Sequence, residues 1–169
     1  AVQALFDALD AFPQARIIFT KANADSGGRL INRMVDDYVA RQPERAKAFV
    51  SLGQLRYLSL MRQADAVVGN SSSGLIEAPS ALTPTVNIGD RQKGRLRAPS
   101  VIDCADDAGA IEAALGRALS PDFQAIAAKG ENPYGRGDAS QHIKNKLRDV
   151  SLEGILLKRF YDIEGLAEH

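Results

Sequence analysis

Short runs of apolar residues alternate along the chain with longer stretches in which apolar residues recur at helical spacing. The short runs predict strands at 16–20, 48–52, 66–68, 83–88 and 101–103. The longer stretches predict helices at 2–12, 30–39, 55–61, 73–82, 106–118, 121–129 and 138–149. In the third of these helices the side chains expected to face inward are Leu55, Tyr57, Leu58 and Met61. Because strands that alternate with helices build a parallel sheet covered on both faces, we predict a three-layer α/β fold.

The central strand, at 66–68, ends abruptly in the small polar residues Gly69-Asn70-Ser71-Ser72-Ser73-Gly74. A helix is expected to follow, and a strand, a tight turn and a helix together direct backbone N–H groups toward an anion. The serines add hydroxyl donors without bulk, and Glu77 offers two acceptor oxygens to neighbouring hydroxyls such as those of a ribose. This stretch predicts a nucleotide diphosphate site. The simpler interpretation is a helix N-cap, since Ser and Asn cap helices without any ligand.

Polar loops at 21–28, 69–74 and 89–97 all follow the carboxyl ends of predicted strands. Ligands of parallel α/β sheets bind beyond those ends, so we expect the loops to converge on one rim. The last loop carries the cations Arg91, Lys93, Arg95 and Arg97. A guanidinium can hold two diphosphate oxygens, and Arg91 is the best candidate because it lies closest to its strand. The alternative for each cation is a solvated, mobile loop.

The sequence offers no complete catalytic set. Histidines occur only at His142, inside a predicted helix away from the rim, and at the terminal His169. Cys104 has no histidine nearby in sequence and is better explained as a small core residue than as a nucleophile. Glu77 is the only carboxylate well placed at the rim, and a lone acid fits ribose binding better than acid–base chemistry. We therefore predict the binding half of an enzyme, without catalytic residues of its own.

Composition narrows the classes of function. The 169 residues fit one domain, and 21 Lys and Arg balance 21 Asp and Glu, so no basic field suggests nucleic acid or an anionic membrane as a partner. No stretch approaches the ~20 apolar residues of a membrane span. The single cysteine excludes an internal disulfide framework and fits a reducing cytoplasm.

The sequence starts at Ala1, without methionine and inside an expected helix. Its first residues lack the basic region and cleavage pattern of a signal peptide. We therefore expect no signal peptide in these first residues, and we expect the chain to be a piece of a longer, cytoplasmic one.

Taken together, the motifs resemble the hydrolysing UDP-N-acetylglucosamine 2-epimerases of sialic acid synthesis. The resemblance is carried by 69–74 with Glu77, by 83–95, by Asn23-Ala24-Asp25 and by Asn132-Pro133-Tyr134-Gly135, and it extends from about residue 14 to 148. It implies that the chain is the C-terminal, Rossmann-like half of a GT-B-like two-domain fold. In that family UDP lies in the cleft between the two domains.

The resemblance also assigns roles to individual residues. Ser71 and Ser72 match the diphosphate contacts of the family, Glu77 matches its ribose ligand, and Arg91 matches a nucleotide-contacting arginine. These assignments agree with the chemistry expected of residues 69–74, called here the serine turn, and of residues 89–97, called the arginine loop.

Two further positions rest mainly on the resemblance. Leu52, at the end of the strand expected from Ala48, falls where family members contact the uracil through backbone groups. Asn23 aligns with a ligand position of the family, although its residue type by itself predicts only a turn.

The family reaction that the resemblance implies eliminates UDP after proton loss at C2 and then adds water, giving N-acetylmannosamine. It implies no metal and no redox cofactor. The catalytic acids and histidine would lie in the N-terminal domain and just upstream of this chain, so we expect this chain alone to be inactive. Related enzymes act on diacetamido sugars, some with GDP in place of UDP, and the sequence does not separate these substrates.

Two other classes of function stay open at this point. The chain could be the donor-binding half of a GT-B glycosyltransferase, or a free-standing nucleotide-binding module. We expect a UDP-sugar-binding domain over 1–150 and a C-terminal helix within 151–169, running from about 152 to 160. That helix would pack on the missing N-terminal domain or on another copy of the chain, giving a homo-oligomer; the alternative is that it packs on its own domain.

Overall fold

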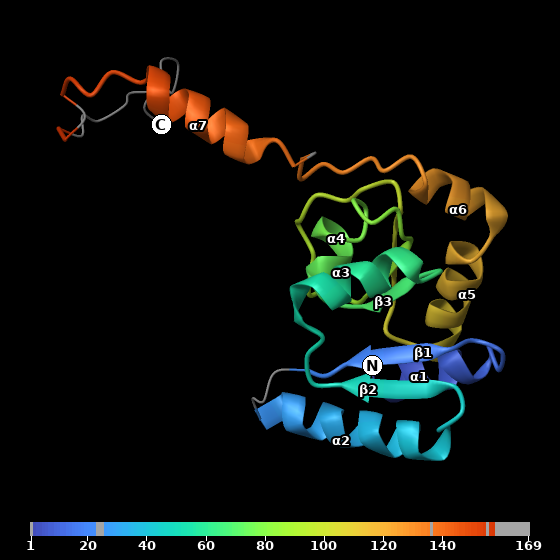
Figure 1. Ribbon diagram of the computed structural model, residues 1–169. Coiled ribbons are helices and arrows are strands. Elements are labelled where there is room, and N and C mark those ends of the chain that lie inside the picture. Colours follow the sequence, from blue (N-terminus) through green and yellow to red (C-terminus); the bar gives the residue numbers. More distant parts are fainter. Residues whose placement is uncertain (1, 23–25, 136, 155, 158–169) are drawn as a thin grey trace, which may run out of the picture. The chain divides into compact units, whose positions relative to one another are not determined.

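The computed structural model describes residues 2–22, 26–135, 137–154 and 156–157. The chain divides into two compact units, Ala1–Tyr134 and Gly135–His169. The first unit contains every described strand and the residues of the predicted site (Figure 1). The division falls after Tyr134, earlier than the boundary at 150 expected from the sequence.

The strands of the first unit run parallel and fall into two groups. They are β1 (Ile17–Thr20), β2 (Ala46–Phe49), β3 (Val67–Gly69), β4 (Thr85–Ile88) and β5 (Val101–Cys104). Hydrogen bonds join β1 to β2 in one sheet and join β3, β4 and β5, in that order, in a second. The predicted α/β fold with parallel strands is confirmed.

Helices connect β1 to β2, β2 to β3 and β3 to β4, as predicted, whereas β4 and β5 are joined by a loop. They are α1 (Val2–Asp10), α2 (Ser26–Arg41), α3 (Gly53–Gln63), α4 (Ser73–Ile76), α5 (Ala108–Ala118) and α6 (Pro121–Ala127). Figure 1 shows α2 lying along the β1–β2 sheet. None of the helices within the described ranges is long and apolar enough to cross a membrane.

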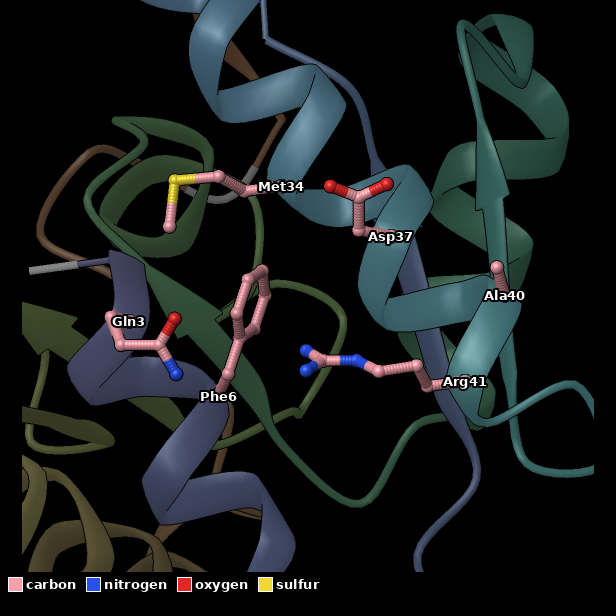
Figure 2. Close-up of a pocket in the computed structure, with 6 residues that line it drawn as sticks. All are labelled: Gln3, Phe6, Met34, Asp37, Ala40 and Arg41. Atoms are coloured by element: carbon pink, nitrogen blue, oxygen red, sulfur yellow. The ribbon is translucent and has the colours of Figure 1, made fainter.

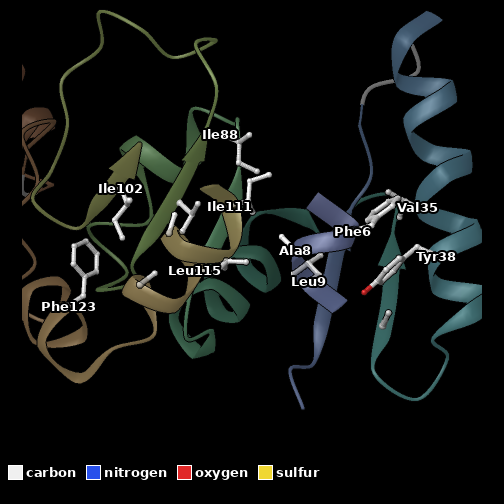
Figure 3. Close-up of a cluster of buried hydrophobic side chains, with 14 residues drawn as sticks. Phe6, Ala8, Leu9, Val35, Tyr38, Ile88, Ile102, Ile111, Leu115 and Phe123 are labelled. Atoms are coloured by element: carbon white, nitrogen blue, oxygen red, sulfur yellow. The ribbon is translucent and has the colours of Figure 1, made fainter. Parts of the chain in front are cut away.

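One hydrophobic cluster runs through both sheets of the first unit (Figure 3). Helix α1 lies between α2 and α5, and it contributes Phe6 and Leu9 to the cluster. The Phe6 ring stacks on Tyr38 with centroids 4.6 Å apart. On the other side, β4 is buried at every position and places Val86 in the cluster beside Ile111 of α5. The shared core thus joins two sheets that are not hydrogen-bonded to each other.

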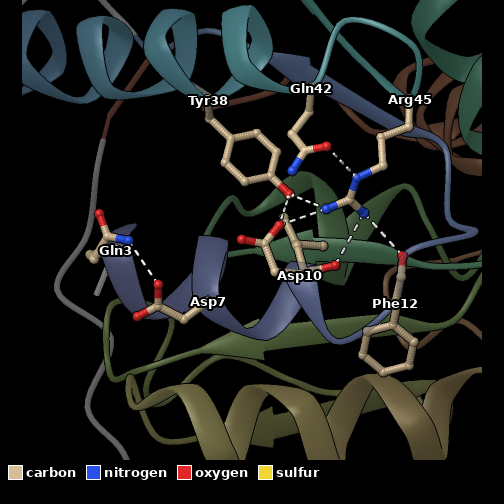
Figure 4. A network of polar contacts seen from close by, with 8 residues as sticks. Gln3, Asp7, Asp10, Phe12, Tyr38, Gln42 and Arg45 are labelled. Atoms are coloured by element: carbon tan, nitrogen blue, oxygen red, sulfur yellow. Dashed lines mark hydrogen bonds and ion pairs between the residues drawn. The ribbon is translucent and has the colours of Figure 1, made fainter.

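A polar network closes the end of α1 against the same core (Figure 4). Arg45 donates from Nη1 to the carbonyl oxygens of Leu9, at 3.2 Å, and Phe12, at 3.0 Å. Its Nη2 donates to Asp10 at 2.6 Å and to the Tyr38 hydroxyl at 2.7 Å. That hydroxyl in turn donates to Asp10 at 2.8 Å. Arg45 immediately precedes β2, so its side chain ties α1 and α2 to the start of that strand.

Burial, together with the hydrogen bond to Asp10, raises the pKa of Tyr38 to about 12. A raised folded-state pKa contributes stability that is complete below the unfolded value of about 10 and is lost as the pH rises toward 12. Tyr38→Phe removes this titration. We expect the difference in unfolding free energy between wild type and Tyr38→Phe to shrink between about pH 10 and 12. Urea unfolding at a series of alkaline pH values would measure it, and a difference that stays constant contradicts the prediction.

Several boundaries differ from the predicted ones. Strand β2 ends at Phe49, so Leu52 lies beyond the strand at the N-cap of α3 and not at the strand end. Leu55 is 81% exposed, and the expectation that it faces inward is wrong, whereas Met61 is buried as predicted. Helix α4 ends at Ile76 instead of near Leu82. Pro79 lacks the N–H group that would continue the helix, and the chain leaves through Leu82 at φ 65°.

In the second unit, α7 (Ala139–Asp149) confirms the predicted helix at 138–149. Asp138 is its N-cap residue, but its side chain makes no capping bond and lies 3.2 Å from His142 Nε2 instead. Residues 150–154 and 156–157 form turns and irregular chain where a helix from about 152 was expected. The remainder of that expected helix lies outside the described residues.

Candidate functional site

The serine turn connects β3 to α4 in a conformation that its small residues permit. Gly69 ends β3 at φ 147°, which a residue with a side chain rarely adopts. The Ser71 hydroxyl accepts from the backbone N–H of Ser73 at 3.3 Å, and Ser72 is the N-cap residue of α4. Ser71 is exposed and Ser72 is half-buried, so both lie where a ligand can reach the turn.

Gly74 lets α4 approach β4 directly. A Cβ at this position would lie 2.7 Å from the Cγ2 atom of Thr85, and the Thr85 hydroxyl donates to the Gly74 carbonyl at 2.8 Å. The serine turn therefore rests on the buried strand β4. Since α4 has only four residues, its dipole is small, and the anion binding predicted from the sequence would depend on the hydroxyls and backbone N–H groups of the turn.

The arginine loop meets the serine turn through Asn70. Gln92 is buried and donates from Nε2 to the Asn70 carbonyl at 2.8 Å. Arg91 is exposed and donates from Nη1 to the side-chain oxygen of Asn70 at 3.4 Å. The predicted convergence of loops 69–74 and 89–97 is confirmed. Of the third predicted loop, 21–28, residues 26–28 belong to α2, and residues 23–25, which include Asn23, lie outside the described ranges.

Arg97 joins the arginine loop to strand β5. Its Nε donates to Asp103 Oδ2 at 2.7 Å and its Nη1 donates to the Gln92 carbonyl at 3.0 Å. The other oxygen of Asp103 accepts from the Asn87 side chain at 2.6 Å. Arg97 is thus anchored rather than mobile, and the loop that carries Arg91 has a defined base on β4 and β5.

Glu77 is held by Ser73, the last serine of the predicted site, and through it by Tyr57, which the sequence did not place at the site. The Ser73 hydroxyl donates to Glu77 Oε2. The Tyr57 hydroxyl lies 2.7 Å from Ser73 Oγ, and it is the donor of that pair because the Ser73 proton already goes to Glu77. Tyr57 was expected only as an inward-facing residue of its helix. The i, i+4 spacing of Ser73 and Glu77 is the one sequence signal that predicts their contact.

The turn at 132–134 forms hydrogen bonds to the region around the end of α4 and to the arginine loop. Asn132 Nδ2 donates to the Ile76 carbonyl, at the end of α4, at 2.9 Å and to the Ser80 hydroxyl at 2.7 Å. Tyr134 donates from its hydroxyl to the carbonyl of Leu96, in the arginine loop, at 3.2 Å. This accounts structurally for a motif that the sequence offered only as part of a resemblance.

Two of the pockets on the first unit are lined by residues other than Leu52, Ser71, Ser72, Glu77 and Arg91. The first, of about 490 Å³, lies between α1 and α2 (Figure 2). It is lined by Gln3, Phe6, Met34, Asp37, Ala40 and Arg41. The second, of about 780 Å³, lies beyond the carboxyl ends of β4 and β5 and includes Lys93, Arg97 and Asp103. No cluster of three or more metal-binding side chains occurs among the described residues.

Cys104 sits at the end of β5, half-buried against the core. Burial, together with the charges of Asp103 and Asp107, raises the pKa of its thiol. A protonated thiol is a poor nucleophile, which supports its interpretation as a packing residue.

A protein-family model described as UDP-N-acetylglucosamine 2-epimerase matches residues 1–148. The chain belongs to the UDP-N-acetylglucosamine 2-epimerase family. Over 163 residues it is 42% identical to the GDP/UDP-N,N'-diacetylbacillosamine 2-epimerase (hydrolyzing) of Campylobacter jejuni, covering 96% of this chain and 42% of that protein. Over 164 residues it is 33% identical to the polysialic acid biosynthesis protein P7 of Escherichia coli, covering 96% and 41%. The chain therefore spans about two fifths of the length of these relatives.

Solved structures of the 2-epimerase family share the fold. The UDP-GlcNAc 2-epimerase from Neisseria meningitidis bound to UDP-GlcNAc superposes with a TM-score of 0.68 at 18% identity, covering 88% of this chain and 40% of that one. The S. aureus MnaA–UDP co-structure superposes with a TM-score of 0.69 at 16% identity, covering 87% and 41%. The predicted resemblance to the 2-epimerase family and its GT-B-like fold is confirmed.

Within this 2-epimerase family member, the predicted site residues fall into two groups. Ser71, Ser72 and Arg91 lie on the two loops joined at Asn70, and Glu77 directly follows α4. Leu52 is half-buried at the start of α3, in the connection that leaves β2. Asn23 lies outside the residues that the structure describes.

Proposed function

We propose that this chain is the nucleotide-sugar-binding domain of a hydrolysing 2-epimerase that acts on UDP-N-acetylglucosamine and releases UDP and N-acetylmannosamine. The chain binds the UDP portion of the substrate and supplies no catalytic residue. A missing N-terminal domain closes the site and carries out proton removal at C2. The chain alone is therefore inactive and binds its nucleotide weakly.

The observation that carries this proposal is the joining of the serine turn to the arginine loop at Asn70. Asn70 accepts from both Gln92 and Arg91, so a guanidinium is tied to a residue of the serine turn. Hydroxyl donors and an arginine fork in one place are the groups that bind a diphosphate. Glu77, directly after the helix that leaves the same turn, then serves as the acceptor for the ribose hydroxyls.

A diacetamido sugar is a second candidate for the substrate. It is favoured by the 42% identity to the C. jejuni enzyme, whose name gives N,N'-diacetylbacillosamine as the sugar and both GDP and UDP as the nucleotide. In our proposal the residues that face the sugar lie outside this chain. The preference of this chain for UDP or GDP narrows the nucleotide, and activity assays of the full-length enzyme identify the sugar.

Side-by-side NMR titrations of the chain with UDP, GDP and UDP-N-acetylglucosamine test the proposal. We expect UDP to shift the backbone signals of residues 71–77 and 91, and to bind more tightly than GDP. Preferential binding of GDP assigns the chain to a guanosine-linked sugar. If none of the three shifts these signals at millimolar concentration, the proposed nucleotide site is wrong.

A further inference from the structure

Helices α3 and α4 are linked by a directed chain of hydrogen bonds that ends on a carboxylate. Tyr57 of α3 donates to Ser73 at the first turn of α4, and Ser73 donates to Glu77 at the end of α4. All three side chains are half-buried. The Tyr57 hydroxyl donates to Ser73, the Ser73 hydroxyl donates to Glu77, and the Glu77 carboxylate is the final acceptor.

Holding the Tyr57 and Ser73 side chains in fixed rotamers costs conformational entropy. Glu77 is half-buried and keeps part of its contact with water, so the hydrogen bond from Ser73 adds only a modest net stability. The gain lies in orientation, because Ser73 fixes Oε2 and thereby sets the direction in which Oε1 can accept a hydrogen bond. A pair of neighbouring hydroxyls is a ligand for which that direction matters.

We propose that Tyr57 is a positioning residue for nucleotide binding, acting through Ser73 to orient Glu77 toward the two ribose hydroxyls. The inference rests on the proposed function, since it needs Glu77 to be the ribose ligand. Tyr57 itself touches no ligand. It restricts the Ser73 hydroxyl to one rotamer, so that the Ser73 proton always points to Glu77.

The test compares UDP with 2',3'-dideoxy-UDP, which keeps the base and the diphosphate but lacks both ribose hydroxyls. Affinities for both ligands are measured by NMR titration of the wild-type chain and of Tyr57→Phe. In the wild type, UDP binds about tenfold or more tightly than its dideoxy analogue, as expected for hydrogen bonds to a charged group. Tyr57→Phe lowers this ratio by roughly three- to tenfold and leaves the affinity for dideoxy-UDP unchanged.

Three further variants separate positioning from folding. Ser73→Ala and Glu77→Gln remove the later links of the chain and lower the ratio at least as much as Tyr57→Phe does. Tyr38→Phe removes a hydroxyl of the same kind from the network around Asp10 and Arg45. It lowers the melting temperature but leaves the ratio at the wild-type value, which shows that lost stability alone does not change the discrimination.

The possible failures are distinguishable. If Tyr57→Phe weakens both ligands equally, or leaves the ratio intact, Tyr57 supports only the fold and the inference is overturned while the ribose role of Glu77 stands. If the wild type already binds the two ligands equally, the ribose role of Glu77 is wrong and the inference falls with it. If the wild type binds neither ligand, the proposed nucleotide site is wrong and so is everything built on it.

Discussion

Replacing Arg45 by alanine is expected to lower the free energy of unfolding by about 2–4 kcal/mol. The guanidinium is 13% exposed and holds the Leu9 and Phe12 carbonyls, the Asp10 carboxylate and the Tyr38 hydroxyl together. Without it, the two carbonyls and the hydroxyl lose a charged donor in a partly buried place. Asp10 is half exposed and recovers water, so its ion pair adds less than a fully buried pair would.

Urea unfolding at neutral pH measures this effect, with two matched variants. Arg45→Lys keeps the charge but not the fork, and we expect it to recover less than half of the loss because a lysine cannot reach all four acceptors. Arg16→Ala removes an exposed arginine just before β1 and is expected to change stability by less than about 0.5 kcal/mol. A loss for Arg45→Ala that is no larger than that for Arg16→Ala would contradict the structural role of the network.

The order of strands and helices could be predicted because it depends on periodicity, which is a local property. Every described strand and helix of the first unit corresponds to a predicted one. The errors lie where an apolar residue meets a loop. Leu55 has the spacing of a core residue but lies in the first turn of α3, where no described residue covers it, and it is 81% exposed. Helix α4 stops early because of Pro79, which the apolar pattern around it hides.

The candidate site could be predicted in part. The serine turn, Glu77 and Arg91 are recognisable because their residue types suit a nucleotide and because they follow strand ends. The groups that position them are not, since Tyr57 reaches Ser73 only after α3 and α4 pack together, and Arg97 reaches Asp103 only once the loop has folded beside β5. Periodicity describes Tyr57 as a core residue, and charge describes Arg97 as a loop cation. Neither description includes the hydrogen-bond partner, Ser73 for Tyr57 and Asp103 for Arg97, that gives the residue its role in the site.

The joining of the two loops at Asn70 makes Arg91 the residue on which binding should depend most strongly. Arg91→Ala is expected to weaken UDP binding by about 1.5–3 kcal/mol, or roughly 10- to 150-fold, because a charge-assisted contact to the diphosphate is lost. Ser72→Ala removes a neutral hydroxyl and is expected to cost only about 0.5–1.5 kcal/mol. Neither change should unfold the domain, since Arg91 is exposed and Ser72 makes no side-chain capping bond.

The matched control for Arg91 is Lys93→Ala, which removes an exposed cation two positions further along the same loop. NMR titration with UDP at two salt concentrations compares the variants. If the loop acted only through its charge, both would lose the same affinity, and added salt would remove both losses. We expect instead that Lys93→Ala loses less than about threefold and that the loss for Arg91→Ala persists in salt, because Asn70 holds that guanidinium beside the serine turn. Equal losses in the two variants would contradict a positioned arginine and leave only a charged loop.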